Sequence, residues 1–165
     1  MDAAIIVIAI SAVLFGILPI IFRSSAALIF LTLAAGELVS RLTAQDATQL
    51  VRSLPATNGL PTYSIVQIVL LTIAPLIILI AYKNSIKPSQ LFFHFLPAVA
   101  SVLVCVMLVT AKLPYEAKDA VENSQIYATI EPFFSVAVAA GLLSSALYLI
   151  ATKPKHHKNK KHNLK

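Results

Sequence analysis

Hydrophobic residues along the chain fall into five long runs separated by short polar stretches. The runs cover residues 3–22, 25–40, 63–82, 91–111 and 132–151. Four of them reach the roughly 20 residues that an α-helix needs to cross the bilayer's hydrocarbon core of about 30 Å. Backbone polar groups find no water to bond inside lipid, so helices are the expected structure for such runs. The pattern therefore predicts an all-α polytopic integral membrane protein.

The second run is the shortest, because its uninterrupted apolar part ends at Glu37. It still crosses the bilayer if the helix extends to Ala44 and the Arg41 side chain reaches the headgroups. Five spans are then predicted, over residues 3–22, 25–44, 63–82, 91–111 and 132–151. The alternative has four spans, with the second run lying in the membrane interface.

Basic residues give the predicted bundle its orientation. Six lysines lie between Lys153 and Lys165, and the rest of the chain has equal numbers of basic and acidic residues. Clustered basic residues normally stay in the cytoplasm. With the C-terminus inside, five spans place the N-terminus outside, with nine basic residues inside and four outside. The four-span alternative gives eight and five, so five spans, N-out and C-in, are favoured.

The last 13 residues differ in composition from residues 1–152, the predicted transmembrane domain. They are low in complexity and predict a disordered basic cytoplasmic tail, residues 153–165. Each lysine close to an anionic leaflet contributes about 1 kcal/mol of attraction. Contact with anionic lipid headgroups is therefore predicted for Lys153, Lys155, Lys158, Lys160 and Lys161. A topological signal alone is the interpretation we favour, and we expect no nucleic-acid partner.

Two polar segments are predicted to lie outside. Residues 41–54 read either as a continuation of the second helix, which we favour, or as an amphipathic helix on the outer leaflet. Residues 112–131 are acidic and predict a solvated loop, in which Pro114 opens a short helix.

Glu37 is the most notable polar residue within the predicted spans, because charge inside lipid is costly. The favoured interpretation is an ion pair with Arg41, one helical turn later. The alternative is a proton or cation site. In that case Glu37, Gln67, Thr110 and Glu131 together line an outward-facing polar pocket.

The other polar or unusual residues within the predicted spans can be explained without a functional site. His94, at the inner end of the fourth span, is expected to be an interfacial side chain rather than a proton relay or metal ligand. Pro75 and Pro97 lie within spans and predict kinks, which serve as hinges in transporters and are also common in passive helices. Cys105 is the single cysteine, so it forms no intramolecular disulfide. We expect no metal and no cofactor.

Small residues at four-residue spacing predict close helix packing in the last span, at Ala137, Gly141 and Ser145. The first span has a weaker version, Ala12 and Gly16. We favour a partner helix within the same chain. A second protein or another copy of this chain is the alternative.

Signatures of enzymes are missing from the sequence. It has no His-Glu-x-x-His, no Gly-x-Ser-x-Gly and no glycine-rich phosphate loop. The chain resembles the colicin V production-type membrane proteins, which are short multi-pass chains with an Arg-Gly element after the first span, followed by an acidic residue. The likeness here consists of Arg23 and the general plan over the first third. Ser24 stands in place of the glycine, and no acidic residue lies between Arg23 and Glu37.

The sequence thus predicts a non-enzymatic membrane protein, an accessory or scaffold subunit of an assembly. A small transporter or channel built around Glu37 is the main alternative, with Pro75 and Pro97 as hinges. An enzyme acting on lipid at the outer face is a third. The first run is expected to stay in the mature protein. The chain has no glycosylation sequon, and this favours a bacterial plasma (inner) membrane.

Overall fold

The computed structural model describes residues 3–53, 61–83 and 91–151. In this part of the chain the residues are helical apart from short turns, and no strand occurs, which confirms the all-α prediction. The predicted basic tail and its five lipid-contacting lysines, Lys153, Lys155, Lys158, Lys160 and Lys161, lie outside the described residues.

The helices follow the hydrophobic runs. They are α1 (Ala3–Ser11), the π-helical η1 (Ala12–Ile17), α2 (Leu18–Ile21), α3 (Ala26–Arg52), α4 (Thr62–Ala81), α5 (Leu91–Thr110), α6 (Tyr115–Glu122), α7 (Gln125–Ile130), the 3-10 turn η4 (Glu131–Phe133) and α8 (Phe134–Ala151). α3 continues without a break through residues 41–52 of the first polar segment. Pro114 is the N-cap of α6, so a short helix begins where proline favours one.

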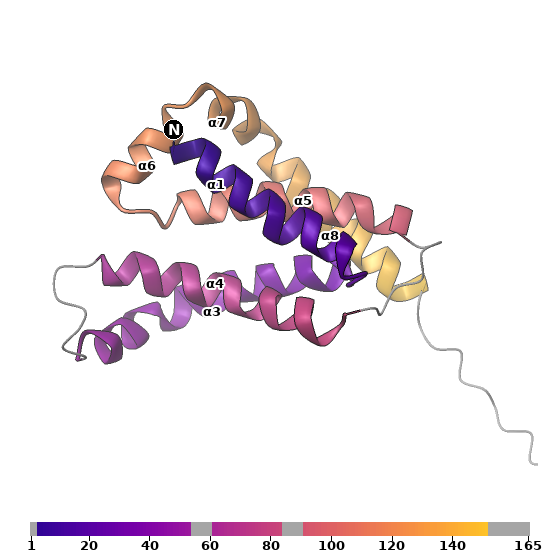
Figure 1. The fold of residues 1–165 in the computed structure, drawn as a ribbon, viewed down its shortest axis with the longest axis horizontal. Helices are drawn as coiled ribbons and strands as arrows, with labels where there is room; N and C mark the ends of the chain where they lie inside the picture. The colour runs from indigo at the N-terminus through magenta and orange to yellow at the C-terminus, as the bar shows by residue number, and fades with distance from the viewer. Residues whose placement is uncertain (1–2, 54–60, 84–90, 152–165) are drawn as a thin grey trace, which may run out of the picture.

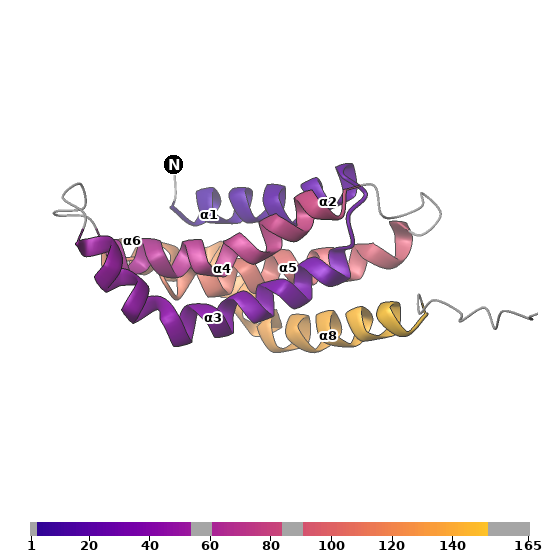
Figure 2. The ribbon, with the colours of Figure 1, turned by 90° about the horizontal axis from the view of Figure 1, so that it is seen from below.

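The long helices lie lengthwise, and the chain passes back and forth between two ends (Figures 1 and 2). The end that carries α6 and α7 also holds the start of α1, the end of α3 and the start of α4 (Figure 1). We call it the α6 end. The opposite end holds the turn between α2 and α3 and the end of α8.

The turn at the opposite end has a defined C-cap geometry. Arg23 adopts a left-handed conformation with φ of 48°. Its N–H donates to the Ile20 carbonyl, and the Ser24 N–H donates to the Pro19 carbonyl at 2.9 Å. These two bonds form a Schellman motif, which closes the α2 end of the first helix. Ser25 then caps α3 by accepting a hydrogen bond from the Leu28 N–H.

Three helical stretches among the described residues are long and apolar enough to cross a membrane. They are Ala26–Arg52, Thr62–Ala81 and Gln125–Ala151. Two shorter apolar helices, Ile5–Ile21 and His94–Thr110, lie beside them.

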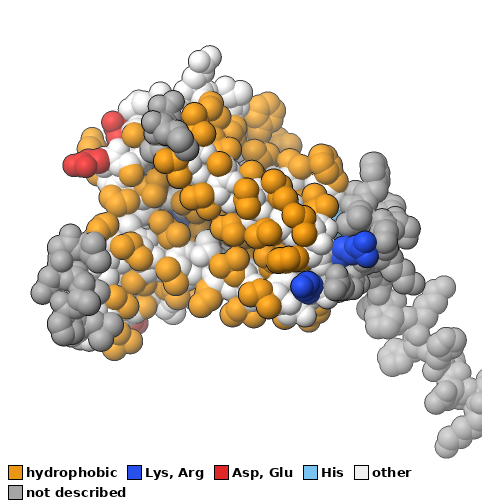
Figure 3. All heavy atoms as spheres, in the orientation of Figure 1, with side chains coloured by type: hydrophobic (Ala, Val, Ile, Leu, Met, Phe, Trp, Pro, Cys, Tyr) orange, Lys and Arg blue, Asp and Glu red, His pale blue; other side chains and the backbone are white. Residues whose placement is uncertain are grey.

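The outer surface of these helices is strongly apolar (Figure 3). Large side chains such as Ile80, which is 72% exposed, and Leu143, which is 66% exposed, point away from the core. Water-soluble monomers rarely expose contiguous apolar surface on this scale. The most prominent charged side chains in this view lie toward the two ends, with acidic groups beside α6 and basic groups at the opposite end.

A close helix contact joins α3 to α4 through a glycine. A Cβ added to Gly36 would lie 2.5 Å from the carbonyl oxygen of Leu71. Pro75, four residues after Leu71, has no N–H to donate to that carbonyl. The carbonyl therefore faces the Gly36 backbone across the interface, at a distance that only a residue without a side chain allows.

Gly36 belongs to a buried stripe of small residues at four-residue spacing, which continues with Ser40, Ala44 and Thr48. Small side chains let helix backbones approach closely in lipid. This stripe was missed by our sequence analysis, which assigned small-residue faces only to the first and last spans.

The small face of α8 is also buried, at Ala137, Gly141 and Ser145. A Cβ on Gly141 would collide with the ring of Phe30 from α3. In the first helix, Ala12 is half-buried, and a Cβ on Gly16 would lie 3.2 Å from Val102 of α5. Gly16 and Gly141 thus face helices of the same chain.

Candidate functional site

The charged residues most able to take part in chemistry gather around Glu37, at the start of the fourth turn of α3. The Arg41 Nε donates a hydrogen bond to the Glu37 Oε1 at 2.6 Å. The pair follows the i,i+4 spacing and the Glu-first order that favours such pairs on a helix. Glu37 is largely buried, with 14% of its side chain exposed, whereas the Arg41 side chain is 70% exposed.

A second cation reaches the same carboxylate from elsewhere in the chain. Lys112, in the turn after α5, places its Nζ 2.9 Å from the Glu37 Oε2, and only 7% of the lysine side chain is exposed. The prediction of a solvated loop over residues 112–131 is therefore wrong for Lys112. A carboxylate held inside the helix packing needs a compensating charge, because an unpaired buried ion is strongly destabilising.

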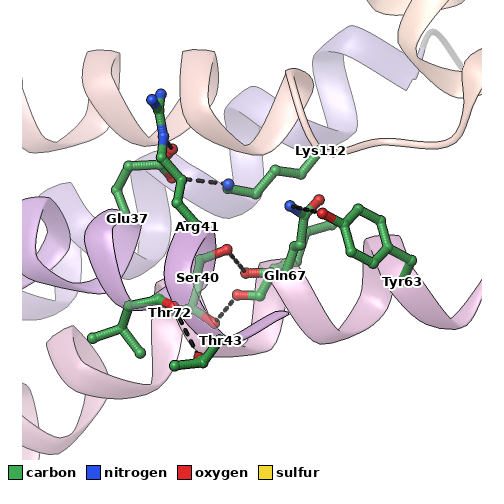
Figure 4. A network of polar contacts seen from close by, with 10 residues as sticks. Glu37, Ser40, Arg41, Thr43, Tyr63, Gln67, Thr72 and Lys112 are labelled. Carbon is green, nitrogen blue, oxygen red and sulfur yellow. Dashed lines mark hydrogen bonds and ion pairs between the residues drawn. The ribbon is translucent and has the colours of Figure 1, made fainter. Parts of the chain in front are cut away.

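The neighbouring polar groups bond to one another rather than to Glu37 (Figure 4). The Ser40 hydroxyl donates to the backbone carbonyl of Gln67 at 3.2 Å, which ties α3 to α4. The Gln67 side-chain amide donates to the Tyr63 hydroxyl, also at 3.2 Å. Gln67 thus turns along its own helix toward the start of α4.

Thr110 and Glu131, the other two members of the predicted polar pocket, differ in their exposure to solvent. Thr110 is fully buried, and its hydroxyl has no hydrogen-bond partner among the described residues. Glu131 begins η4 and is exposed. The structure thus brings Glu37 together with Lys112, which sequence analysis missed, rather than with Gln67 and Glu131.

A lateral groove of about 250 Å³ reaches Glu37 from the outside of the bundle. It is lined by Phe30, Ala34, Glu37, Leu38 and Arg41 of α3, Val104 and Leu108 of α5, and Phe134, Val138 and Leu142 of α8. Apart from Glu37 and Arg41 the lining is apolar. Gln67, Thr110 and Glu131 do not belong to it, so the groove differs from the predicted polar pocket.

His94 is buried within the helix packing. Its side chain is 2% exposed, and its ring packs edge-on against Tyr148 of α8, with 4.3 Å between the ring centroids. Neither ring nitrogen has a hydrogen-bond partner among the described residues. The packing of α5 on α8 encloses the ring, a tertiary effect that the position of His94 near a helix end does not reveal.

Metal and redox chemistry find no support in the described part of the chain. No group of three histidine, cysteine, aspartate or glutamate side chains gathers there to hold a metal ion. Cys105 is a buried free thiol within the helix core. The Glu37 cluster is therefore the candidate site, with two cations around one carboxylate and a formal net charge of +1.

Comparison with known proteins identifies no relative of this chain. No protein-family model matches the chain, and no curated protein or solved structure matches it significantly. The resemblance to the colicin V production-type proteins therefore still rests on Arg23 and the general plan alone.

Proposed function

We propose that the protein is an integral membrane protein with five spans, its N-terminus outside and its C-terminus in the cytoplasm. The apolar outer surface and the three helices long enough to cross a bilayer support this placement. Lengthwise passage of α1, α3, α4, α5 and α8 between the two ends supports the number of spans. The positive-inside count supports the orientation, and we assign the protein to a bacterial plasma membrane.

Within that membrane, we propose a non-enzymatic role as an accessory or scaffold subunit of an assembly. The observation that carries this proposal is that the Glu37 carboxylate is already ion-paired within the protein. Glu37 is held by Arg41 and by the buried Lys112, so its carboxylate is occupied by the protein's own cations. Such a cluster fixes helices relative to one another, which is what a scaffold requires.

Native mass spectrometry of the full-length protein, extracted gently from its own membrane, tests this role. We expect a heteromeric assembly with a defined stoichiometry. A monomer or a homo-oligomer with no other subunit would contradict the accessory role. A variant with Lys112→Met alone is the informative comparison, since it leaves the buried Glu37 carboxylate without this cation. Loosening the helices in this way should weaken the assembly without removing any surface charge of the tail.

A small transporter or channel is the second candidate, and Thr110 favours it. A buried hydroxyl without a partner among the described residues is costly unless something binds it. Thr110 lies two residues before Lys112, which forms the ion pair with Glu37. In this mechanism a proton or cation separates Glu37 from Lys112 during passage.

Proton flux into liposomes that contain the purified protein and a pH-sensitive dye separates the two roles. A transporter should lose flux on Glu37→Gln and keep it on Glu131→Gln, since Glu131 is exposed and apart from the ion pair. Absence of flux in the wild type, or equal flux in both variants, counts against transport of protons through this cluster.

A further inference from the structure

The lateral groove beside Glu37 carries charge at one end only. Along α3 its lining begins at Phe30 and ends at Arg41, and the two charged residues stand toward the α6 end. Eleven residues of helix correspond to about 16 Å at a rise of 1.5 Å per residue. The groove thus runs along α3, opens to the outside of the bundle, and is apolar except at the end where Glu37 and the guanidinium of Arg41 lie.

The proposed membrane placement gives this groove a direction. If α3 crosses the bilayer, the groove runs beside the acyl chains of surrounding lipids, and Arg41 lies on the side of the headgroups. The α8 wall follows the same direction, because Phe134, Val138 and Leu142 stand at four-residue spacing on one face.

Arg41 has hydrogen-bonding capacity to spare. Its Nε is bonded to Glu37, and Figure 4 shows the terminal guanidinium nitrogens pointing away from the other labelled residues. Arginine binds phosphate oxygens in a bidentate manner through such nitrogens. Because Arg41 and Lys112 share the single carboxylate of Glu37, the cluster keeps a formal net charge of +1.

We propose that this groove binds a phospholipid with an anionic headgroup. The phosphate lies on the Arg41 guanidinium, and one acyl chain follows the apolar wall past Ala34, Val104 and Val138. Basic pockets between transmembrane helices recognise anionic headgroups by the same combination of charge and apolar surface. This inference rests on the proposed membrane placement and goes beyond it by naming a ligand class and a site.

A second groove on the same bundle provides a control. It measures about 200 Å³ and lies between the first helix and α5, lined by Gly16, Ile20, Phe95, Ala98, Val99, Val102 and Leu103. Its lining contains no charged residue. It should therefore accept lipid chains without regard to the headgroup.

The test uses the absence of tryptophan from the chain. A single tryptophan is introduced as Leu142→Trp in the charged groove or as Val99→Trp in the uncharged one, both at partly exposed positions. Each full-length variant is reconstituted into vesicles that contain either phosphatidylglycerol or phosphatidylcholine with brominated acyl chains, which quench tryptophan fluorescence on contact. Titration of the brominated lipid into unlabelled lipid measures its relative affinity.

At Leu142→Trp we expect about fivefold higher affinity for the anionic lipid, which corresponds to about 1 kcal/mol. Adding Arg41→Gln should abolish that preference, and Arg41→Lys should retain part of it. At Val99→Trp the two lipids should quench equally.

Four outcomes would overturn the proposal. Equal quenching by both lipids at Leu142→Trp rules out headgroup recognition. A preference at both positions that survives Arg41→Gln reports general attraction of anionic lipid to the protein. Quenching at Val99→Trp with none at Leu142→Trp means that a partner helix or a second copy fills the groove. Absence of quenching at both positions contradicts the membrane placement itself.

Discussion

The Lys112 ammonium lies 2.9 Å from the Glu37 carboxylate and joins the turn after α5 to the fourth turn of α3. Substitution of Lys112 by methionine keeps the length of the side chain but leaves the buried oxygen of Glu37 without its cation. Breaking one partner of a buried pair costs about 3 kcal/mol or more. We expect Lys112→Met to lower the thermal midpoint in detergent markedly.

The added substitution Glu37→Gln should recover much of that loss, because it removes the uncompensated charge. Lys118→Met is the matched control. Its pair with Glu122 spans 3.6 Å and is half-exposed, so the loss should stay below about 1 kcal/mol. Equal destabilisation by both lysine substitutions would contradict a special role for Lys112.

Gly36 should tolerate no side chain, because the Leu71 carbonyl occupies the space a Cβ needs. We expect Gly36→Ala to push α3 and α4 apart and to destabilise the protein by about 1–3 kcal/mol, the usual cost of overpacking. Thermal unfolding followed by circular dichroism measures it. Ala35→Val, at an exposed position of the same turn, is expected to leave the midpoint unchanged.

Gly141 and Phe30 should behave as a coupled pair. A methyl group on Gly141 would collide with the Phe30 ring, so Gly141→Ala is expected to destabilise the α3–α8 contact. Phe30→Leu makes room for the methyl group and should partly rescue it. A double-mutant cycle measures the coupling free energy between the two substitutions. Residues in direct contact usually give 0.5–3 kcal/mol, and we expect about 1 kcal/mol here. Additive effects would mean that the two residues do not share the contact.

The orientation is open to chemical labelling. In a Cys105→Ala background, single cysteines at Asp46 and Lys83, both exposed, stand near opposite ends of the bundle. A membrane-impermeant maleimide added to intact cells should label the cysteine at 46 and spare the one at 83. The reverse pattern inverts the proposed orientation. Labelling of both or neither, against a permeabilised control, contradicts an odd number of passes between them.

Much of the fold is readable from the sequence, since long apolar runs have few alternatives to helix. The Glu37–Arg41 pair is also readable, because its spacing lies within one helix. Lys112 is not, because a lysine in a polar segment looks solvated until the packing of α3 against α5 is known. The burial of His94 cannot be read from the sequence for the same reason, since it depends on packing against Tyr148 of another helix.

One missed feature did have a signal in the sequence. Gly36, Ser40, Ala44 and Thr48 recur every four residues, a spacing that predicts close helix packing in lipid. The π-helical turn of η1 has no comparable pattern. Its wider winding becomes visible only from the backbone.

The 27 residues of α3 form a rod of about 40 Å, which exceeds the hydrocarbon thickness of a typical bilayer by about 10 Å. Such a helix adapts to a thicker membrane by a smaller tilt from the bilayer normal and to a thinner membrane by a larger tilt. Since α4 is locked to it at Gly36, the two tilt as one body. The hairpin would then make the protein tolerant of membranes of different thickness, while the shorter helices set the limit of that tolerance.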